Sequence, residues 1–429
     1  MAFVPIILVF VLYFSGIPIA FALLGSSLFY FGVMNTGAAP DLILQKFITS
    51  TQSFPLLAIP FFIMAGSIMN YSGISAKLMS FAEVLMGHKP GGLAQVNVLL
   101  SMLMGGVSGS ANADCAMQSK MLVPEMEKRG YSKGFASAIT AASSAVTPVI
   151  PPGINLIVYA LIAGVSVGKM FLAGYVPGII MAIALMTTVH IISKKRGYGA
   201  DRPAKASGKE ILKQGLDSLW ALLFPFGIIA LLRLGVITPS ETGAVAVLYC
   251  LIVGVFIYRK LKWGHLPVIL KETVEGTASV VLIIVAANVF GYYMTWERIP
   301  QMLTELLLGI TQNKWIMLLI INVLLLILGM FLEGGACIII LAPLLCPVAQ
   351  QLGIDLVHFG LVCIVNIMIG GLTPPFGSMM FTTCQITGCE LNDFVKEALP
   401  MMLALLIALI VITYLPWLTT VIPNLVFGA

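Results

Sequence analysis

Residues 105–114 of this chain read GGVSGSANAD, a run of small and polar residues that begins at Gly105 and ends on the carboxylate of Asp114. The run lies inside a strongly apolar segment, and TPVIPPG interrupts the next apolar stretch at residues 147–153. Irregular or polar backbone at membrane depth is tolerated only where protein or a water-filled cavity surrounds it. Similar interruptions recur in the second half of the chain. We predict that all four meet to form one transport site.

The composition predicts a membrane protein. Of 429 residues, 59% are hydrophobic and 10% are charged, whereas soluble proteins carry roughly 25% charged residues. Apolar runs of about 20 residues, the length that crosses a hydrocarbon core as a helix, recur from end to end. We therefore expect an all-α polytopic membrane protein with the lipid bilayer as its surroundings. The net charge of +5 reflects basic loops rather than nucleic-acid binding.

Two further features of the sequence concern the N-terminal apolar segment and the cysteines. No basic residue precedes Lys46, so the apolar start is expected to be a retained span rather than a cleaved signal. The seven cysteines lie in or beside apolar segments without CxxC spacing, and we expect them to be small core residues.

The apolar runs and their breaks predict the helices. Residues 1–33 form either one long bent helix or two short spans, because Ser15–Pro18 interrupts them. Thr238 and Glu241 have the spacing of a helix cap. The other expected elements are helices at about 54–70, 74–86, 132–147, 153–165, 170–193, 216–235, 241–258 and 277–296, hairpins at 91–123 and 315–346, a broken helix at 356–386 and a span beyond residue 399.

The basic loops predict the orientation in the membrane. Residues 194–213 are the only long hydrophilic segment and are rich in Lys and Arg, so the positive-inside rule places them in the cytoplasm. A second basic cluster, Arg259, Lys260, Lys262 and Lys271, follows after two predicted spans. Two spans return the chain to the same side of the membrane, so both basic loops are predicted to be cytoplasmic.

The two halves of the chain repeat each other. When the sequence is shifted along itself so that Gly106 falls on Gly329, four of the five prolines between positions 106 and 177 coincide with prolines between positions 329 and 400. Random placement would give fewer than about one such match. The coinciding pairs are Pro124 with Pro347, Pro151 with Pro374, Pro152 with Pro375, and Pro177 with Pro400.

The charges of the loops swap sides between the halves, as an inverted-topology repeat requires. Each repeat is expected to contain a re-entrant helical hairpin and a broken helix. The predicted division is a scaffold at 1–91, a transport part with the first hairpin at 92–193, a cytoplasmic linker at 194–213, a second scaffold part at 214–300, and a second transport part with the second hairpin at 301–429.

The interruptions expose backbone groups that can bind ions. A broken helix frees carbonyl oxygens at one end and N–H groups at the other; the carbonyls suit sodium and the N–H end favours an anion. The Pro pairs at 151–152 and 374–375 ensure such breaks. Glu333 and Asp114 are carboxylates expected near the midplane, where such residues are functional candidates, although each could instead be buried in a satisfied hydrogen-bonded pair.

Four motifs, in order, resemble the large membrane (M) subunit of tripartite ATP-independent periplasmic (TRAP) transporters. The resemblance covers essentially the whole chain. The family often has Ser after the first Pro-Pro, where this chain has Gly153. The motifs are IPFFIMAG at 59–66, GGVSGSANAD at 105–114, PVIPP at 148–152 and GVITPSE at 235–241.

The resemblance implies a secondary active transporter subunit of the bacterial inner membrane, not an enzyme. It implies sodium-coupled uptake of an organic acid by an elevator motion, with two or more sodium ions and no organic cofactor. The expected partners are a periplasmic substrate-binding protein and a small four-helix membrane subunit. Among the substrates of this family, the hydroxyl and amide side chains expected at the site favour a sialic or sugar acid. A C4-dicarboxylate is the next candidate.

The resemblance also assigns residues. One sodium site would use Ser108 and Ser110 with the carbonyls of Thr147, Ile150 and Pro152. The other would use Gly329, Gly370, Thr373 and Phe376. Substrate would contact Ser110, Asn112, Asn155, Glu333 and Ser378.

Two rival functions belong to other classes. An intramembrane serine protease is suggested by GVSG at 106–109, and Ser108 would then need His190 or His358 as its base. Neither histidine lies on a segment that the repeat places beside Ser108, and proteolysis does not explain a duplicated interruption. A channel would require a continuous polar path rather than paired re-entrant tips. No phosphate loop or HExxH zinc motif occurs.

Overall fold

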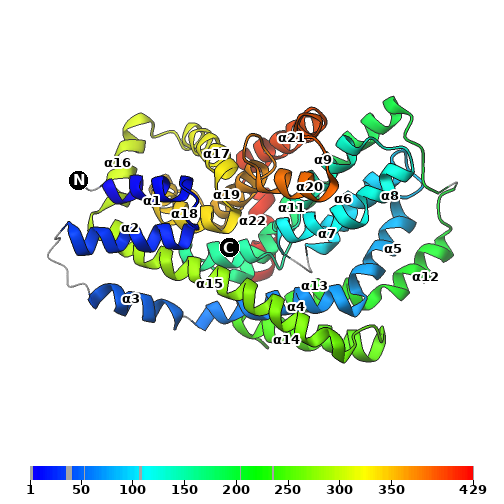
Figure 1. Cartoon of the computed structure of the whole chain (residues 1–429), viewed down its shortest axis with the longest axis horizontal. Coiled ribbons are helices and arrows are strands. Elements are labelled where there is room, and N and C mark those ends of the chain that lie inside the picture. The colour runs from blue at the N-terminus through cyan, green and yellow to red at the C-terminus, as the bar shows by residue number, and fades with distance from the viewer. Residues whose placement is uncertain are drawn as a thin grey trace.

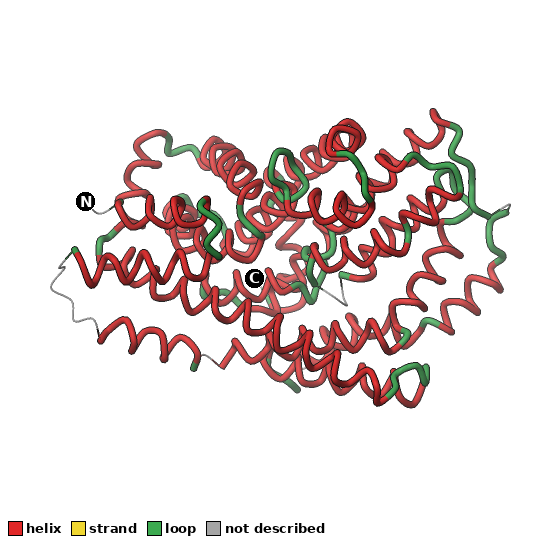
Figure 2. The backbone as a smooth tube through the Cα atoms, in the orientation of Figure 1, coloured by secondary structure: helices red, strands yellow, loops and turns green. Residues whose placement is uncertain are grey.

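The computed structural model describes residues 3–34, 41–52, 54–105, 109–202, 204–233 and 236–428. Within these ranges all regular structure is helical, as Figure 2 shows, so the all-α prediction is confirmed. Five segments are long and apolar enough to cross a membrane, in agreement with a polytopic membrane protein. They are Val167–Arg196, Trp263–Trp296, Lys314–Phe331, Gly334–Gln351 and Leu391–Tyr414.

The N-terminal apolar segment forms two helices, α1 (Val4–Phe14) and α2 (Ile19–Val33), that pack against each other. The chain turns at Gly16, whose φ of +93° favours glycine. Of the two alternatives left open by the sequence, two short helices are therefore correct. With 11 residues, α1 is about 17 Å long and too short to cross a bilayer core alone.

The long helix α15 (Leu266–Trp296) organises the outer part of the molecule. It packs along α2, α3 (Asp41–Thr51) and α4 (Ala58–Ser72) across the lower part of Figure 1. A 3-10 turn at Phe54–Leu57 precedes α4, and a capping box of Thr238 and Glu241 begins α14, as predicted. The remaining outer helices are α5 (Ile74–Met86), α13 (Leu219–Arg233), α14 (Pro239–Ile252) and α16 (Ile299–Ile310).

The inner part of the molecule consists of the interrupted segments. Helix pairs α6/α7 and α17/α18 occupy the two predicted hairpin regions, both predicted breaks are present, and each Pro-Pro pair contains a cis peptide bond. The helices are α6 (Gly92–Met104), α7 (Ala111–Met121), α8 (Val123–Lys128), α9 (Lys133–Ser144), α10 (Ile154–Ala163), α11 (Val167–Arg196), α17 (Lys314–Phe331), α18 (Gly334–Gln351), α19 (Leu356–Gly370), α20 (Ser378–Thr387), α21 (Leu391–Tyr414) and α22 (Trp417–Phe427).

Glycines let α11 approach the first break closely. A Cβ atom on Gly174 would lie 2.1 Å from the carbonyl oxygen of Val149, and one on Gly178 would lie 2.2 Å from Cδ1 of Ile150. These separations are far below van der Waals contact, so only glycine allows this packing. The backbone of the first break is thereby held against a continuous helix.

The predicted linker is more structured than a loop. Helix α11 continues to Arg196, and a short helix α12 (Gly208–Asp217) is capped by Ser207. The helix α16 was not predicted, and the boundary expected between residues 300 and 301 falls inside it. Helix α21 (Leu391–Tyr414) corresponds to the final predicted span and begins earlier than expected. It ends just before Pro416, and a further short helix, α22, follows.

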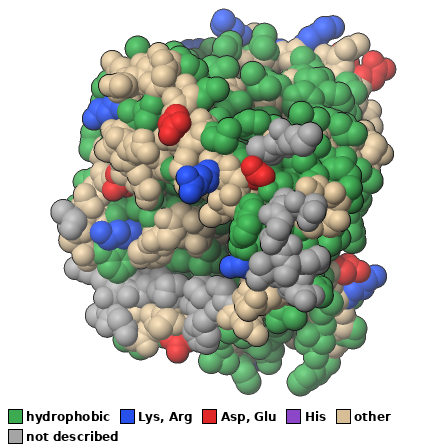
Figure 3. Space-filling model, turned by 90° about the vertical axis from the view of Figure 1, so that its left-hand side faces the viewer, with side chains coloured by type: hydrophobic (Ala, Val, Ile, Leu, Met, Phe, Trp, Pro, Cys, Tyr) green, Lys and Arg blue, Asp and Glu red, His purple; other side chains and the backbone are tan. Residues whose placement is uncertain are grey.

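The surface is largely apolar. Figure 3 shows the left-hand end of the view in Figure 1, where hydrophobic side chains cover much of the face and charged groups are scattered. Leu44 and Ile48 of α3 and Leu306 and Ile310 of α16 are exposed. Exposed side chains of this kind are suited to the hydrocarbon of a bilayer.

Candidate functional site

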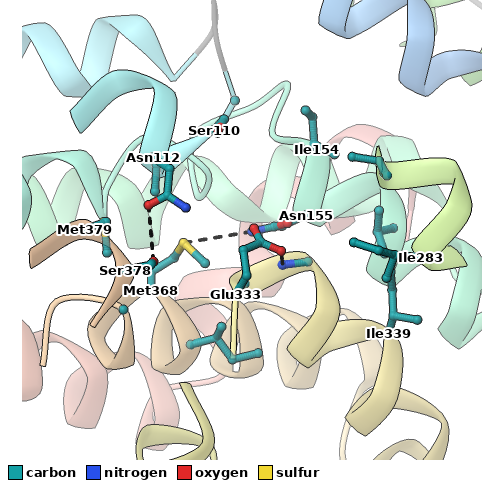
Figure 4. Close-up of a pocket in the computed structure, with 18 residues that line it drawn as sticks. Ser110, Asn112, Ile154, Asn155, Ile283, Glu333, Ile339, Met368, Ser378 and Met379 are labelled. Carbon is teal, nitrogen blue, oxygen red and sulfur yellow. Dashed lines mark hydrogen bonds between the residues drawn. The ribbon is translucent and has the colours of Figure 1, made fainter. Parts of the chain in front are cut away.

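A central pocket of about 110 Å³ lies where the interrupted segments meet (Figure 4). It is lined by the starts of four helices, by Ile367, Met368 and Gly371 at the second break, and by Val280 and Ile283 of α15. The structure brings together all five residues that the sequence assigned to substrate, so their proximity is now established while their role remains a prediction. These lining residues are Ser110, Asn112, Asn155, Glu333 and Ser378.

The four helices that begin at the pocket are α7, α10, α18 and α20. The first N–H groups of a helix have no partner within it and carry partial positive charge. Side chains cap α7 and α18, whereas Gly153 and Gly377 leave α10 and α20 without a side-chain cap. The backbone N–H groups of Asn155 and Ser378 donate no hydrogen bond within the described residues. These two helix starts can therefore receive an anion.

Polar side chains join the two halves across the pocket. Oγ of Ser378 donates a hydrogen bond to Oδ1 of Asn112 at 3.3 Å, which connects α20 to α7. Nδ2 of Asn155 lies 4.0 Å from the sulfur of Met368, a weak acceptor. Figure 4 shows both contacts. Among the described residues, the amide of Asn155 thus has no strong acceptor and can donate to a ligand.

Glu333 caps α18 from its N-cap position. Oε2 accepts hydrogen bonds from the backbone N–H groups of Gly335 at 3.0 Å and Ala336 at 3.3 Å. Ser110 holds the same position before α7, where Oγ accepts from the N–H of Ala113 at 3.4 Å. The two caps differ in charge, because one is a carboxylate and the other a hydroxyl.

Glu333→Ala is expected to reduce the free energy of unfolding by about 1 kcal/mol, because it removes the cap of α18. Glu333→Asp should retain most of that stability, since Asp is a strong N-cap residue. Thermal unfolding of the purified chain in detergent measures both. Glu305→Ala, on the exposed surface of α16, is the matched control and should leave the midpoint unchanged. Equal unfolding of Glu333→Ala and wild type would contradict the capping role.

Asp114 lies behind the pocket, fully buried, and does not line it. Its Oδ2 accepts hydrogen bonds from Oγ of Ser101 at 2.8 Å, Nε2 of Gln118 at 2.7 Å and Oγ1 of Thr147 at 2.9 Å. Within the described residues its Oδ1 has no partner. Asp114 therefore joins α6, α7 and the first break, and the expectation of a hydrogen-bonded carboxylate is confirmed for one oxygen only.

Two hydrogen-bond partners of Asp114, Ser101 and Gln118, were not predicted from the sequence. Gln118 follows Asp114 by one helical turn, which places both on one face of α7. Ser101 is a lone polar residue in the apolar stretch of α6. The four-residue spacing was therefore a usable signal, whereas the contact of Ser101 depends on how the hairpin closes.

The first predicted sodium site lies at the break between α9 and α10. Thr147, Ile150 and Pro152 are there, and their carbonyl oxygens accept no hydrogen bond from the described residues. A Cβ on Gly109 would lie 2.8 Å from the Pro152 carbonyl oxygen, so the chain entering Ser110 and α7 lies against this break. Ser108, the remaining predicted ligand, lies outside the described residues.

The second predicted sodium site lies where hairpin α17–α18 meets the break between α19 and α20. A Cβ on Gly370 would lie 2.7 Å from Cα of Gly329, so these two backbones touch. The carbonyls of Gly370 and Thr373 accept from the N–H groups of Thr373 at 2.9 Å and Gly377 at 3.2 Å. The carbonyl oxygens of Gly329 and Phe376 accept no hydrogen bond from the described residues.

Side chains alone could not hold a metal ion at these breaks. The described residues contain no group of three or more His, Cys, Asp or Glu side chains arranged for a metal. Any cation held here would be held mainly by backbone carbonyls and hydroxyls, which are ligands for a hard ion.

The two histidines considered as bases for the rival protease lie in different environments. His358 is buried in α19, and its Nδ1 lies 2.9 Å from Oγ1 of Thr419 in a hydrogen bond. His190 is exposed on α11. These positions give no support to a histidine base.

Comparison with known proteins identifies the family. Residues 6–418 match the family model described as tripartite ATP-independent periplasmic transporter, DctM component. The chain is 38% identical, over 97% of both chains, to the sialic acid TRAP transporter large permease protein of Vibrio cholerae. It is 36% identical, over 88% of both chains, to the C4-dicarboxylate TRAP transporter large permease protein of Pseudomonas aeruginosa.

A third relative is the 2,3-diketo-L-gulonate TRAP transporter large permease protein of Escherichia coli, 35% identical over 94% of both chains. The relatives are permease subunits, which favours a transporter over an enzyme. The family match and these identities extend over nearly the full length of the chain, which therefore belongs to the family of TRAP transporter large permease proteins.

Proposed function

We propose that this chain is the permease of a sodium-coupled uptake system for an organic acid in the bacterial inner membrane. The observation that carries the proposal is the convergence of two uncapped helix starts, those of α10 and α20, on the central pocket. A carboxylate bound there accepts hydrogen bonds from backbone N–H groups and lies at the positive ends of two helices.

The substrate is proposed to be a sialic or sugar acid, with a C4-dicarboxylate as the next candidate. Among the described residues no Lys or Arg lines the pocket, so these residues offer no side-chain cation for a second carboxylate. Hydroxyl and amide groups of Ser110, Asn112 and Asn155, and the carboxylate of Glu333, suit the hydroxyls of a sugar acid. Relatives named for sialic acid and 2,3-diketo-L-gulonate support this class of substrate.

Sodium is proposed to bind at both breaks and to couple uptake to its gradient. The unpartnered carbonyls of Thr147, Ile150 and Pro152 support the first site, and those of Gly329 and Phe376 support the second; all five lack a donor among the described residues. Carbonyl oxygens stripped of their helical partners are suitable ligands for a hard cation in an apolar surrounding.

An inverted repeat with an elevator motion is the proposed architecture. Helices α7 and α18 begin at Ala111 and Gly334, and α9 and α19 begin at Lys133 and Leu356. Both pairs of helix starts are separated by the same shift that places Gly106 on Gly329 and aligns the prolines, which supports a duplicated unit. The inner helices would move as a body against α15 and its neighbours.

The partners proposed for this chain follow from its family. A tripartite system contains a small membrane subunit and a periplasmic binding protein that delivers substrate. The exposed apolar surface of the outer helices supports a membrane location for the chain.

Uptake should require a sodium gradient. Proteoliposomes that contain the chain, its small subunit and the binding protein should accumulate a radiolabelled sugar acid when sodium is outside. Replacing sodium by potassium should reduce accumulation to the background of empty liposomes. Sodium on both sides, which removes only the gradient, is the control and should give equilibration without accumulation.

Accumulation that persists when potassium replaces sodium would contradict coupling of uptake to the sodium gradient. A chain that cleaves a membrane peptide in the same liposomes, and loses that cleavage in Ser108→Ala, would favour the protease instead.

A further inference from the structure

The corner between α14 and α15 is an ordered structure built from two short helical turns and a basic loop. A π-helical turn at Val253–Ile257 ends α14, and a short 3-10 turn at Trp263–His265 precedes α15. The carbonyl of Gly254 accepts hydrogen bonds from the N–H groups of Lys260 at 3.0 Å and Leu261 at 3.2 Å. The loop is thus fastened to the last turns of α14. Such π turns often mark functional positions.

A narrow apolar slot of about 120 Å³ opens at this corner. Its walls come from both helices and from the loop, and Trp263 and Lys262 lie at it together. Among the described residues that line it, none is acidic. The lining consists of Leu251, Val255, Leu261, Lys262, Trp263, Leu266 and Ile269.

Three cations lie in this loop, and one of them, Lys262, lines the slot. Arg259, Lys260 and Lys262 are exposed, and none forms an ion pair with a residue that the structure describes. Two nearby carboxylates on α15 already have partners. Glu272 accepts hydrogen bonds from Ser67 and Tyr71, and Glu275 pairs with Lys271 at 3.8 Å.

Trp263 is 89% exposed, next to these cations. Tryptophan gathers at membrane–water interfaces, where its ring sits at the level of the headgroups. The positive-inside rule places the same loop on the cytoplasmic side. The cytoplasmic leaflet carries the anionic lipids that attract basic clusters.

We propose that this corner is a binding site for an anionic phospholipid of the cytoplasmic leaflet. The phosphate lies among Arg259, Lys260 and Lys262, and one acyl chain enters the apolar slot with Trp263 over the glycerol region. Exposed Ile252 and Phe256 extend the apolar surface beyond the slot. The site is independent of the transported substrate and of sodium, so its test stands apart from that of the proposed function.

The test titrates the full-length chain, purified in a neutral detergent, with phosphatidylglycerol and with phosphatidylcholine of the same acyl chains, by native mass spectrometry. Phosphatidylglycerol should bind more tightly. The double variant Lys260→Gln, Lys262→Gln should weaken phosphatidylglycerol binding about 25-fold, from about fivefold per lysine near an anionic surface. The matched control Lys271→Gln, on α15 outside the lining, should bind as wild type.

A second variant tests the slot without changing charge. Val255→Trp fills the cavity and should weaken binding of both lipids, while the cations remain. Equal affinity for the two lipids, or a double variant that binds phosphatidylglycerol like Lys271→Gln, would overturn the proposal. Displacement by inorganic phosphate would assign the cations to a free anion, and displacement by the small subunit would assign the corner to a protein interface; either result contradicts a lipid site.

Discussion

Asp114→Leu should abolish transport and lower the free energy of unfolding by about 3 kcal/mol. The substitution removes the acceptor shared by Ser101, Gln118 and Thr147, three donors in an apolar interior. Gln118 and Thr147 keep second acceptors on Ser101, at 2.7 and 3.2 Å, so the loss is that of one or two buried hydrogen bonds rather than three. Each buried polar group whose partner is lost costs about 1–3 kcal/mol. Thermal unfolding in detergent and uptake in proteoliposomes measure the two effects.

The matched variant is Asp114→Asn, which keeps the size and one acceptor oxygen. It should lose less than half as much stability as Asp114→Leu, since one carbonyl oxygen can still accept from the three donors. If Asp114→Leu unfolds at the wild-type temperature and still transports, the carboxylate does not hold the first hairpin to the break.

Gly370→Ala should reduce uptake by at least about tenfold, the effect of roughly 2 kcal/mol of overpacking at the second break. An added Cβ would lie 2.6 Å from the carbonyl carbon of Gly329 and 3.0 Å from the carbonyl oxygen of Leu326. These atoms belong to backbone that cannot rotate away, so hairpin and break must separate. This separation would disrupt the sodium site proposed at the second break.

Sodium dependence of initial uptake rates measures this effect best. Gly370→Ala should raise the sodium concentration for half-maximal uptake as well as lower the maximal rate. Gly309→Ala is the control, because nothing lies within 4 Å of the added Cβ. Wild-type sodium dependence in Gly370→Ala would contradict the second site.

The breaks and hairpins could be predicted because their causes are local. Two successive prolines remove two amide donors, so the pairs at 151–152 and 374–375 predict breaks. Single prolines are weaker signals here, since Pro177 and Pro400 lie inside α11 and α21. The start of α14 could be predicted for the same reason, because Thr238 and Glu241 satisfy each other's backbone. The five pocket residues came from a resemblance to known motifs rather than from physical reasoning alone.

Features that depend on packing could not be predicted. The interruption at Ser15–Pro18 allowed either one bent helix or two short ones, and the turn at Gly16 and the packing of α1 against α2 decide between them. Helix α16 follows α15 after Glu297 and Arg298, and its amphipathic pattern is too short to be separated from a loop by composition. The partners of Asp114 likewise require the relative placement of α6 and α7.

The unequal caps of α7 and α18 give the central pocket a direction. Ser110 and Glu333 are the N-cap residues of α7 and α18, and Figure 4 shows them on different sides of the cavity. A hydroxyl on one side and a carboxylate on the other interact differently with the two ends of an organic acid. If the pocket binds the proposed substrate, we therefore expect one orientation of that molecule to have the lower energy.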